Sequence, residues 1–188
     1  MNFNAHYNLE GRHAFLSPSQ YHWVHYSPEK LEERYFNSRA AERGTKLHEY
    51  AASAIRLGRK QPKTKDTICM FVNDAIGYSM IPEQPLYYSD NCFGTADAIS
   101  FNRNLLRVHD LKTGVTPASM LQLELYAAIF CLEYAKDPRS IGMELRIYQS
   151  NEKEILVPEP EEIETLMDTI VRFDSIVDKL KEDLREAF

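Results

Sequence analysis

The spacing of hydrophobic residues predicts helices toward both ends of the chain and strands in its middle. Before residue 77, hydrophobic positions recur every three or four residues, as on one face of a helix. This spacing predicts a helix entry at Ser17 and Pro18, a second helix from about Glu29, a third over 39–57 and a short one over 66–76. Gly58 ends the third helix, and the basic stretch 59–65 is expected to be a loop.

The middle of the chain alternates with a period of two, which is typical of strands. We expect strands over 79–88, 92–102, 105–112 and 142–149, with 154–157 either extending or pairing with the last of them. Pro82 and Pro85 make the first strand an edge strand or a bent one. A tight turn over 102–104 joins the second strand to the third, and a helix over 117–134 follows the third.

The last part of the chain, 161–184, has the pattern of one long amphipathic helix. We interpret it as a packing helix with a solvated acidic outer face; its hydrophobic positions at helical period are Ile163, Leu166, Met167, Ile170, Val171, Val177, Leu180 and Leu184. The order of elements predicts one α/β domain with a small mixed sheet flanked by helices. Its expected parts are a mostly helical 1–76, a sheet and helix over 77–157, and a C-terminal helix over 158–188.

Composition is that of a globular protein, at 44% hydrophobic and 27% charged residues. No apolar run approaches the roughly 20 residues that a membrane helix needs, and the first residues lack the order of a signal peptide. Cys69, Cys92 and Cys131 have no C-x-x-C spacing, which excludes a zinc ribbon and favours reduced thiols. We therefore expect a cytoplasmic protein with no membrane partner.

The net charge of −6 disfavours a nucleic-acid partner, but the charge is unevenly distributed. Residues 30–65 hold ten Lys or Arg against four Asp or Glu, whereas residues 152–188 hold five against twelve. The first segment is basic enough to meet phosphates. On charge alone, two solvated helix faces explain the pattern equally well.

The strongest chemical signal lies in two neighbouring strands. Asp110 and Lys112 are two apart, so in a strand they project to the same side, and Asp97 can meet them from the strand before. Two carboxylates can hold a divalent cation, and an ammonium beside them can orient or activate a water. This pattern suits metal-assisted hydrolysis of a phosphodiester, although a simple Asp110–Lys112 salt bridge is an alternative. His109 points the other way and is expected to be a packing residue.

Five short motifs occur in order, and together they resemble a known nuclease family. They are Arg43-Gly44-Thr45-Lys46-Leu47-His48, Glu83-Gln84-Pro85-Leu86, Gly94-Thr95-Ala96-Asp97, Asp110-Leu111-Lys112-Thr113-Gly114 and Gln122-Leu123-Glu124-Leu125-Tyr126. The chain resembles, over about 16–150, the RecB-like branch of the PD-(D/E)XK nuclease superfamily, which includes bacterial recombination nucleases and CRISPR-associated and phage exonucleases. The resemblance implies a restriction-endonuclease-like core and a metal-dependent DNA nuclease, with an exonuclease of recombination, repair or phage and defence DNA processing favoured.

The resemblance also implies a role for each matching residue. His48, Asp97, Asp110 and the Leu111 carbonyl correspond to metal ligands, and Lys112 corresponds to the catalytic lysine beside the catalytic acids Asp97 and Asp110. Gln122 and Tyr126 match a motif that contacts DNA or supports the site, and Arg43 and Lys46 are expected to contact DNA as well. Glu83 falls where such nucleases often carry an acid, and its contact with metal stays open. Carboxylates favour Mg²⁺ or Mn²⁺, and an imidazole shifts the preference toward Mn²⁺.

Several features narrow this interpretation. With three cysteines, none after Cys131, we expect no iron–sulfur cluster. Ala52 breaks the H-E-x-x-H pattern of zinc proteases, and no phosphate-binding helicase loop is present. The expected partner is DNA, single-stranded or at duplex ends, with Tyr21, Trp23 or Tyr35 as stacking candidates. A recombination or defence protein is a further possible partner, and the oligomeric state stays open.

Two other functions compete with a nuclease. The chain could be a catalytically silent DNA- or protein-binding module on a nuclease scaffold, with the acidic C-terminal helix as its docking face. A structural or assembly role has only the chain's size and the long terminal helix in its favour. Against the silent module, every expected catalytic position is filled.

Overall fold

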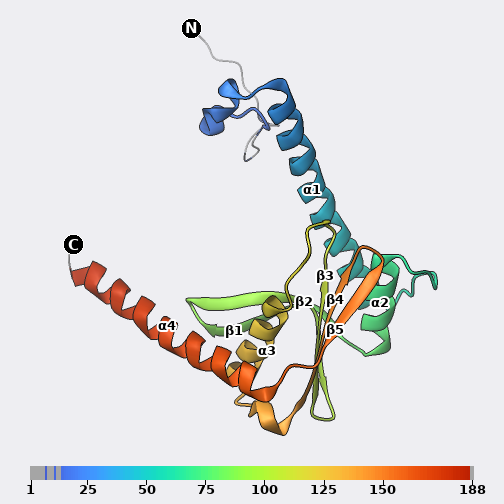
Figure 1. The fold of residues 1–188 in the computed structure, drawn as a ribbon, viewed down its shortest axis with the longest axis vertical. Helices are drawn as coiled ribbons and strands as arrows, with labels where there is room; N and C mark the ends of the chain where they lie inside the picture. Colours follow the sequence, from blue (N-terminus) through green and yellow to red (C-terminus); the bar gives the residue numbers. More distant parts are fainter. Residues whose placement is uncertain (1–6, 8–10, 12–13, 187–188) are drawn as a thin grey trace. The chain divides into compact units, whose positions relative to one another are not determined.

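The computed structural model describes residues 7, 11 and 14–186 of the chain. The chain divides into two compact units, Met1–Arg43 and Gly44–Phe188, and helix α1 (Pro28–Arg56) belongs to both (Figure 1). No helix in the described part of the chain combines the length and the hydrophobicity needed to cross a membrane.

The first unit consists of the 3-10 helix η2 (Pro18–His25) and the first half of α1. Pro18 starts η2 as predicted, but Ser17 does not cap it with its side chain; the Ser17 hydroxyl instead pairs with that of Ser19 at 2.8 Å. The prediction of separate helices from Glu29 and over 39–57 is wrong, because α1 is continuous through both. No proline or glycine lies between Glu29 and Arg43, so nothing in the backbone interrupts the helix there.

The second unit is built on a five-stranded mixed sheet. Its strands are β1 (Ile81–Ser89), β2 (Cys92–Asn102), β3 (Leu105–Leu111), β4 (Gly142–Gln149) and β5 (Glu152–Leu156), and they lie in that order across the sheet. β3 and β4 are parallel and every other neighbouring pair is antiparallel. The predicted α/β class with a small mixed sheet is therefore confirmed, and the stretch after β4 pairs with it as a separate strand.

Local sequence explains the bounds of these strands. Arg103 and Asn104 have φ values of 52° and 59°, which gives the tight turn that was predicted between β2 and β3. β1, which contains Pro82 and Pro85, lies at one edge of the sheet, where a missing backbone N–H costs least.

Two hydrophobic clusters cover the sheet. One joins the sheet to α3 (Leu121–Glu133) and α4 (Pro160–Glu186), and Leu123, Val108 and Ile163 are fully buried in it. The other joins it to α2 (Thr67–Gly77) and to the end of α1, through Ala51, Ala54 and Ile55. Figure 1 shows α3 and α4 on one side of the sheet and α2 on the other. α3 begins four residues later than the predicted start of this helix at Pro117.

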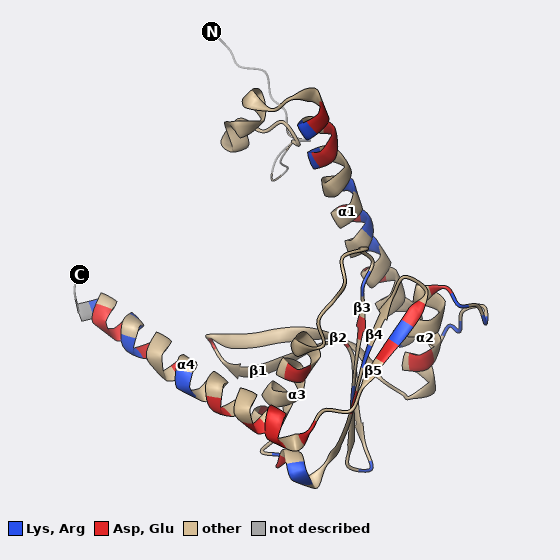
Figure 2. Cartoon of the chain, viewed as in Figure 1, with Lys and Arg blue, Asp and Glu red and all other residues tan. Residues whose placement is uncertain are grey.

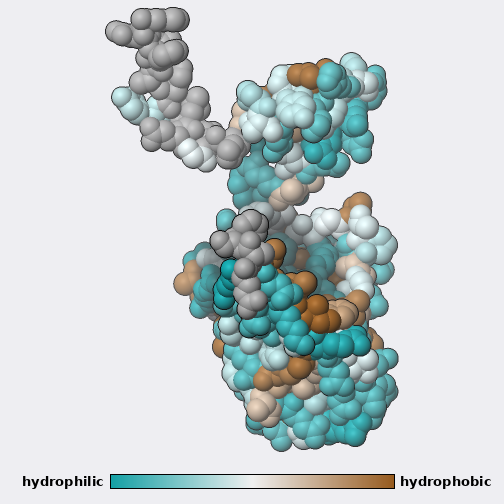
Figure 3. All heavy atoms as spheres, turned by 90° about the vertical axis from the view of Figure 1, so that its left-hand side faces the viewer, coloured by the Kyte–Doolittle hydropathy of each residue, from teal (hydrophilic) through white to brown (hydrophobic). Residues whose placement is uncertain are grey.

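α4 is present as predicted, but only its first half packs. Ile163 and Ile170 are buried, whereas Val177, Leu180 and Leu184 are 36%, 55% and 61% exposed. The interpretation of the whole hydrophobic series as a packing face is therefore wrong. α4 has 27 residues and its partner α3 has 13, so at about 1.5 Å per residue α4 extends well past α3. Figure 3 shows hydrophobic residues exposed among polar ones on the face it turns toward the viewer.

The hairpin between β1 and β2 supports this second half of α4. The side-chain amide of Asn91 donates hydrogen bonds to Asp174 and Asp178, both at 2.8 Å. The Ser89 hydroxyl also bonds to Asp174. These polar contacts, rather than the hydrophobic series, connect the second half of α4 to the sheet.

The three cysteines are free thiols, as the sequence indicates. Cys69 and Cys92 are half-buried and Cys131 is buried. Burial raises the pKa of the Cys131 thiol to about 11, so it stays protonated at neutral pH.

Candidate functional site

Asp97 and His48 form the centre of the candidate site. On β2, one carboxylate oxygen of Asp97 (Oδ2) accepts a hydrogen bond from the backbone N–H of Leu111 at 2.8 Å. The other (Oδ1) lies 3.4 Å from Nδ1 of His48. His48 is on the part of α1 that belongs to the second unit. The hydrogen bond to Asp97 raises the pKa of His48, although burial acts in the opposite direction. Two of the expected metal ligands are therefore in contact.

Glu83 joins this pair through an unusual backbone conformation. Its φ is 51°, a left-handed value that costs energy for a residue with a side chain. Glu83 lies between the paired positions Pro82–Ala98 and Gln84–Ala96 of the β1–β2 ladder. Ligand atoms of His48, Glu83 and Asp97 all lie within 4.8 Å of one another. Burial raises the pKa of Glu83, and the Asp97 charge raises it further.

Asp110 and Lys112 come together at the end of β3. Lys112 Nζ lies 3.1 Å from each carboxylate oxygen of Asp110. Asp110 is buried, and its Oδ2 atom lacks a hydrogen-bond partner of good geometry among the described residues. Burial raises the pKa of Asp110 and the nearby Asp97 charge adds to this, while Lys112 opposes both. The salt bridge considered as an alternative is present, and it leaves one buried oxygen incompletely satisfied.

Gln122 and Tyr126 connect α3 to this group. Lys112 donates a hydrogen bond to Gln122 Oε1 at 2.7 Å, so its ammonium is held between Asp110 and α3. The Tyr126 hydroxyl donates to the Thr95 carbonyl on β2 at 2.7 Å. A Cβ atom at Gly94 would lie 3.0 Å from the Tyr126 ring, so glycine gives the ring room there. Both side chains thus support the site from α3.

The other predicted site residues have different surroundings. The Leu111 side chain is buried in the cluster beneath α2, and its backbone N–H orients Asp97. Arg43 and Lys46 are exposed on α1. Figure 2 shows basic residues along α1 and in the loop that follows it.

Sequence reasoning missed a polar network beneath α2. Asp74 of α2 accepts hydrogen bonds from Arg146 at 3.0 Å and from Tyr148 at 2.7 Å, and Tyr148 in turn lies 3.3 Å from His109. Burial lowers the pKa of His109 to about 3, so its ring is neutral, and His109 is a packing residue as predicted. The signal was available, because Glu144, Arg146 and Tyr148 alternate along β4 and therefore share a face.

The donor set fits a divalent cation. The structure brings together ligand atoms of one imidazole and two acids, His48 with Glu83 and Asp97. Asp110, which was also expected to be a ligand, is not part of this group; it pairs with Lys112 close enough for its charge to act on His48. The pKa values of Glu83 and Asp110 are raised partly because neighbouring carboxylates repel, and a cation would relieve that repulsion. Oxygen ligands with one imidazole suit Mg²⁺ or Mn²⁺, with Mn²⁺ favoured by the nitrogen.

Comparisons with protein family models, with curated proteins and with solved structures found no match to this chain.

Proposed function

We propose that this protein is a Mg²⁺- or Mn²⁺-dependent deoxyribonuclease that hydrolyses phosphodiester bonds. The observation that carries the proposal is the convergence of His48, Glu83 and Asp97 at one side of the sheet, together with the Asp110–Lys112 pair on the adjacent strand. An acidic group alone is common on protein surfaces. A buried acid paired with a lysine beside such a group is a more specific combination.

His48, Asp97 and Asp110 are the proposed metal ligands, with Glu83 as an additional acid and the Leu111 carbonyl as a further ligand. A divalent cation bound there would lower the pKa of a water and neutralise charge that builds on the scissile phosphate. The residues contribute preorganisation, because the Leu111 N–H fixes Asp97 and the sheet fixes Asp110.

Lys112 is the proposed partner of the attacking water and the phosphate. Its ammonium is held by Asp110 at 3.1 Å and by Gln122 at 2.7 Å, and it has a third proton to donate. A compact positive charge in this position can stabilise a phosphate oxygen or orient a water. Tyr126 and Gln122 are positioning residues in this scheme.

DNA as the substrate rests on the motifs and on the basic segment 30–65, where Arg43 and Lys46 are the proposed contacts. The resemblance to RecB-like nucleases favours an exonuclease of recombination, repair or phage and defence DNA processing. A cytoplasmic location belongs to the same proposal.

The decisive experiment is a cleavage assay with Mn²⁺ or Mg²⁺ on single-stranded and duplex DNA labelled at either end, and on a closed circle. The variant is Asp110→Asn, which keeps the side-chain volume and removes the charge. Asp168→Asn, which removes one exposed carboxylate from α4, is the matched control.

Loss of cleavage in Asp110→Asn but not in Asp168→Asn would support the proposal. Degradation of linear DNA alone would make the enzyme an exonuclease, and cutting of the circle would make it an endonuclease. If the wild-type protein cleaves no substrate with either metal, the proposal fails and a binding module becomes the better explanation.

A further inference from the structure

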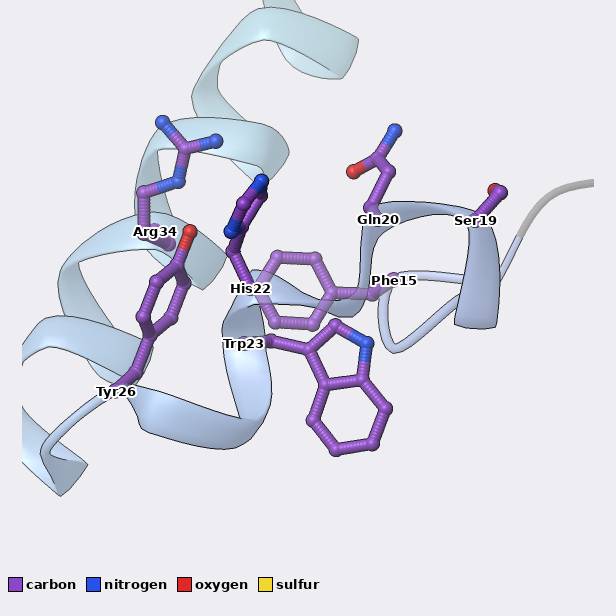
Figure 4. A pocket seen from close by; sticks show the side chains of 7 residues that line it. All are labelled: Phe15, Ser19, Gln20, His22, Trp23, Tyr26 and Arg34. Atoms are coloured by element: carbon purple, nitrogen blue, oxygen red, sulfur yellow. The ribbon is translucent and has the colours of Figure 1, made fainter.

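The first unit contains an aromatic pocket that the proposed catalytic group does not use. Its volume is about 370 Å³. Four rings, a guanidinium, an amide and a hydroxyl line it: Phe15, Ser19, Gln20, His22, Trp23, Tyr26 and Arg34 (Figure 4). This volume falls within the range of small-molecule sites, toward its lower end.

The rings of the pocket are held in place by contacts outside it. The Trp23 indole N–H donates a hydrogen bond to the Ser17 carbonyl at 2.9 Å, which fixes the indole plane. Phe15 packs edge-to-face on Tyr35, with ring centroids 5.3 Å apart. Phe15 lies between His22 and Trp23 in Figure 4. Rings that are already ordered lose little entropy when a flat ligand stacks on them.

The polar groups lie on opposite sides of these rings. Figure 4 shows Arg34, Tyr26 and His22 together on one side, and Gln20 with Ser19 on the other. Among the described residues, Arg34 has no ion-pair partner. Lys30 lies one helical turn before Arg34, with its ammonium 4.8 Å from the centre of the Tyr26 ring. The two positive charges of Lys30 and Arg34 therefore lie on the Tyr26 side of the pocket.

We propose that this pocket binds one nucleotide of single-stranded DNA, with the base stacked on Trp23 and Phe15 and the adjacent phosphate bound by Arg34. The identity of the nucleic acid rests on the proposed nuclease function. A base offers a flat face for the rings, and a phosphate matches the guanidinium. Gln20 has both a donor and an acceptor for a base edge. Paired bases in a duplex are stacked on one another, so an intact duplex cannot place a base in the pocket.

Trp23 is the single tryptophan of the chain, so tryptophan fluorescence reports on this pocket alone. The test titrates the full-length protein, in EDTA to prevent cleavage, with oligothymidylate of about 12 nucleotides, a length within the range of single-strand binding sites. We expect saturable quenching of Trp23 by the single strand and little change with a blunt-ended duplex of two annealed strands. Equal quenching by this duplex, or none by the single strand, would overturn the inference.

Arg34→Ala tests the phosphate contact, with Arg172→Ala on α4 as the matched loss of one exposed positive charge. We expect Arg34→Ala to weaken binding about five-fold or more, with the plot of log K against log salt shallower by about 0.7. Arg172→Ala should bind like the wild type. If the two variants bind alike, Arg34 does not contact the DNA. Far-UV circular dichroism establishes that both variants keep their helices.

A second variant, Phe15→Leu, keeps a hydrophobic side chain and removes one ring. It should reduce affinity by about five-fold or more, in keeping with the cost of losing a stacking partner. Unchanged affinity would contradict stacking on Phe15.

The two proposals fail separately. Quenching without any cleavage activity would support the nucleotide pocket and contradict the nuclease. Cleavage of single-stranded DNA with no response of Trp23 would overturn the pocket and leave the nuclease in place.

Discussion

The carboxylate of Asp97 accepts a hydrogen bond from the backbone N–H of Leu111, with 2.8 Å between the two atoms. The regular β2–β3 ladder runs from Asn102–Leu105 to Ala98–His109. Asp97 precedes Ala98 on β2 and lies just beyond the last of these pairs. There its side chain, rather than its backbone, accepts a hydrogen bond from Leu111 of β3. One oxygen of Asp97 is thus fixed by the backbone, and the other faces His48 at 3.4 Å.

This relationship predicts the behaviour of Asp97→Asn. An asparagine can still accept the Leu111 hydrogen bond through its amide oxygen, so the variant should fold with little loss of stability. It lacks the charge that a divalent cation needs, so its affinity for Mn²⁺ should fall at least ten-fold. The measurement is the shift of the thermal midpoint with Mn²⁺, which for the wild type corresponds to about 2.7 kcal/mol at one hundred times the dissociation constant.

The control for Asp97→Asn is Asp168→Asn, whose thermal midpoint should rise with Mn²⁺ as much as that of the wild type. An Asp97→Asn protein that Mn²⁺ stabilises as much as the wild type would exclude Asp97 as a ligand. Glu83→Gln, measured in parallel, decides whether Glu83 is a ligand or only a neighbouring charge.

Lys112→Met separates chemistry from metal binding. Methionine keeps an unbranched side chain out to the ε position and removes the ammonium that Asp110 and Gln122 hold. We expect the cleavage rate to fall about 100-fold or more, which is the usual effect of losing a positioned acid–base or electrostatic group. Affinity for Mn²⁺, measured by calorimetry, should be retained or increased because a competing cation is gone.

Asp110→Asn provides the contrast, since it should lose both metal affinity and cleavage. A Lys112→Met protein with wild-type cleavage rates would show that the Asp110–Lys112 pair is only a salt bridge.

Gly94 and Tyr126 give a prediction about stability. A Cβ atom at Gly94 would lie 3.0 Å from the Tyr126 ring, and the ring cannot easily move because its hydroxyl is bonded to Thr95. Gly94→Ala should therefore lower the free energy of unfolding by about 1 kcal/mol, the cost of mild overpacking. In a Tyr126→Ala background the same substitution should be neutral or stabilising, because the obstacle is gone.

The two substitutions thus form a double-mutant cycle, measured by urea unfolding. Additive effects within about 0.3 kcal/mol would mean that Gly94 and Tyr126 do not restrain each other.

Regular local patterns allowed most of the fold to be predicted. The bounds of β2 and β4 were predicted to the residue, because alternation and turn residues mark both ends of each strand. The sequence also brought His48, Asp97, Asp110 and Lys112 into one hypothesis, and in the structure these side chains pair at 3.4 Å and 3.1 Å. Asp110 and Lys112 could be paired from the sequence because residues two apart in a strand project to the same side. The His48–Asp97 pair joins a helix to a strand, and only the resemblance of the motifs implied it.

The sequence could not predict features that depend on how elements meet in three dimensions. The hydrophobic period of α4 continues to Leu184, although its packing partner α3 ends at Glu133. Periodicity shows which face of a helix is hydrophobic, but it does not show whether another element packs on that face. Glu83 has a positive φ between two paired positions of the β1–β2 ladder, and glutamate is not a residue type that favours this conformation.

The network around Asp74 yields a prediction about acid stability. Burial alone would raise the pKa of Asp74, but hydrogen bonds from Tyr148 and Lys153, with the charges of Lys153 and Arg146, outweigh it and lower the pKa from its usual value. A group with a lowered pKa in the folded protein stabilises it above the unfolded pKa. That contribution is lost as the pH falls through the folded value.

Asp74→Asn should therefore be less stable than the wild type by about 2 kcal/mol at pH 7, because Arg146 loses a charged partner in a mostly buried position. As the pH falls below about 4 the wild type loses the same contribution, so the difference between the two proteins should shrink toward zero. Urea unfolding in EDTA at a series of pH values from 7 to 3, followed by circular dichroism, measures this. Asp168→Asn, which removes an exposed carboxylate, should show no such gap at any pH. A gap for Asp74→Asn that stays constant down to pH 3 would mean that its carboxylate charge does not stabilise the fold.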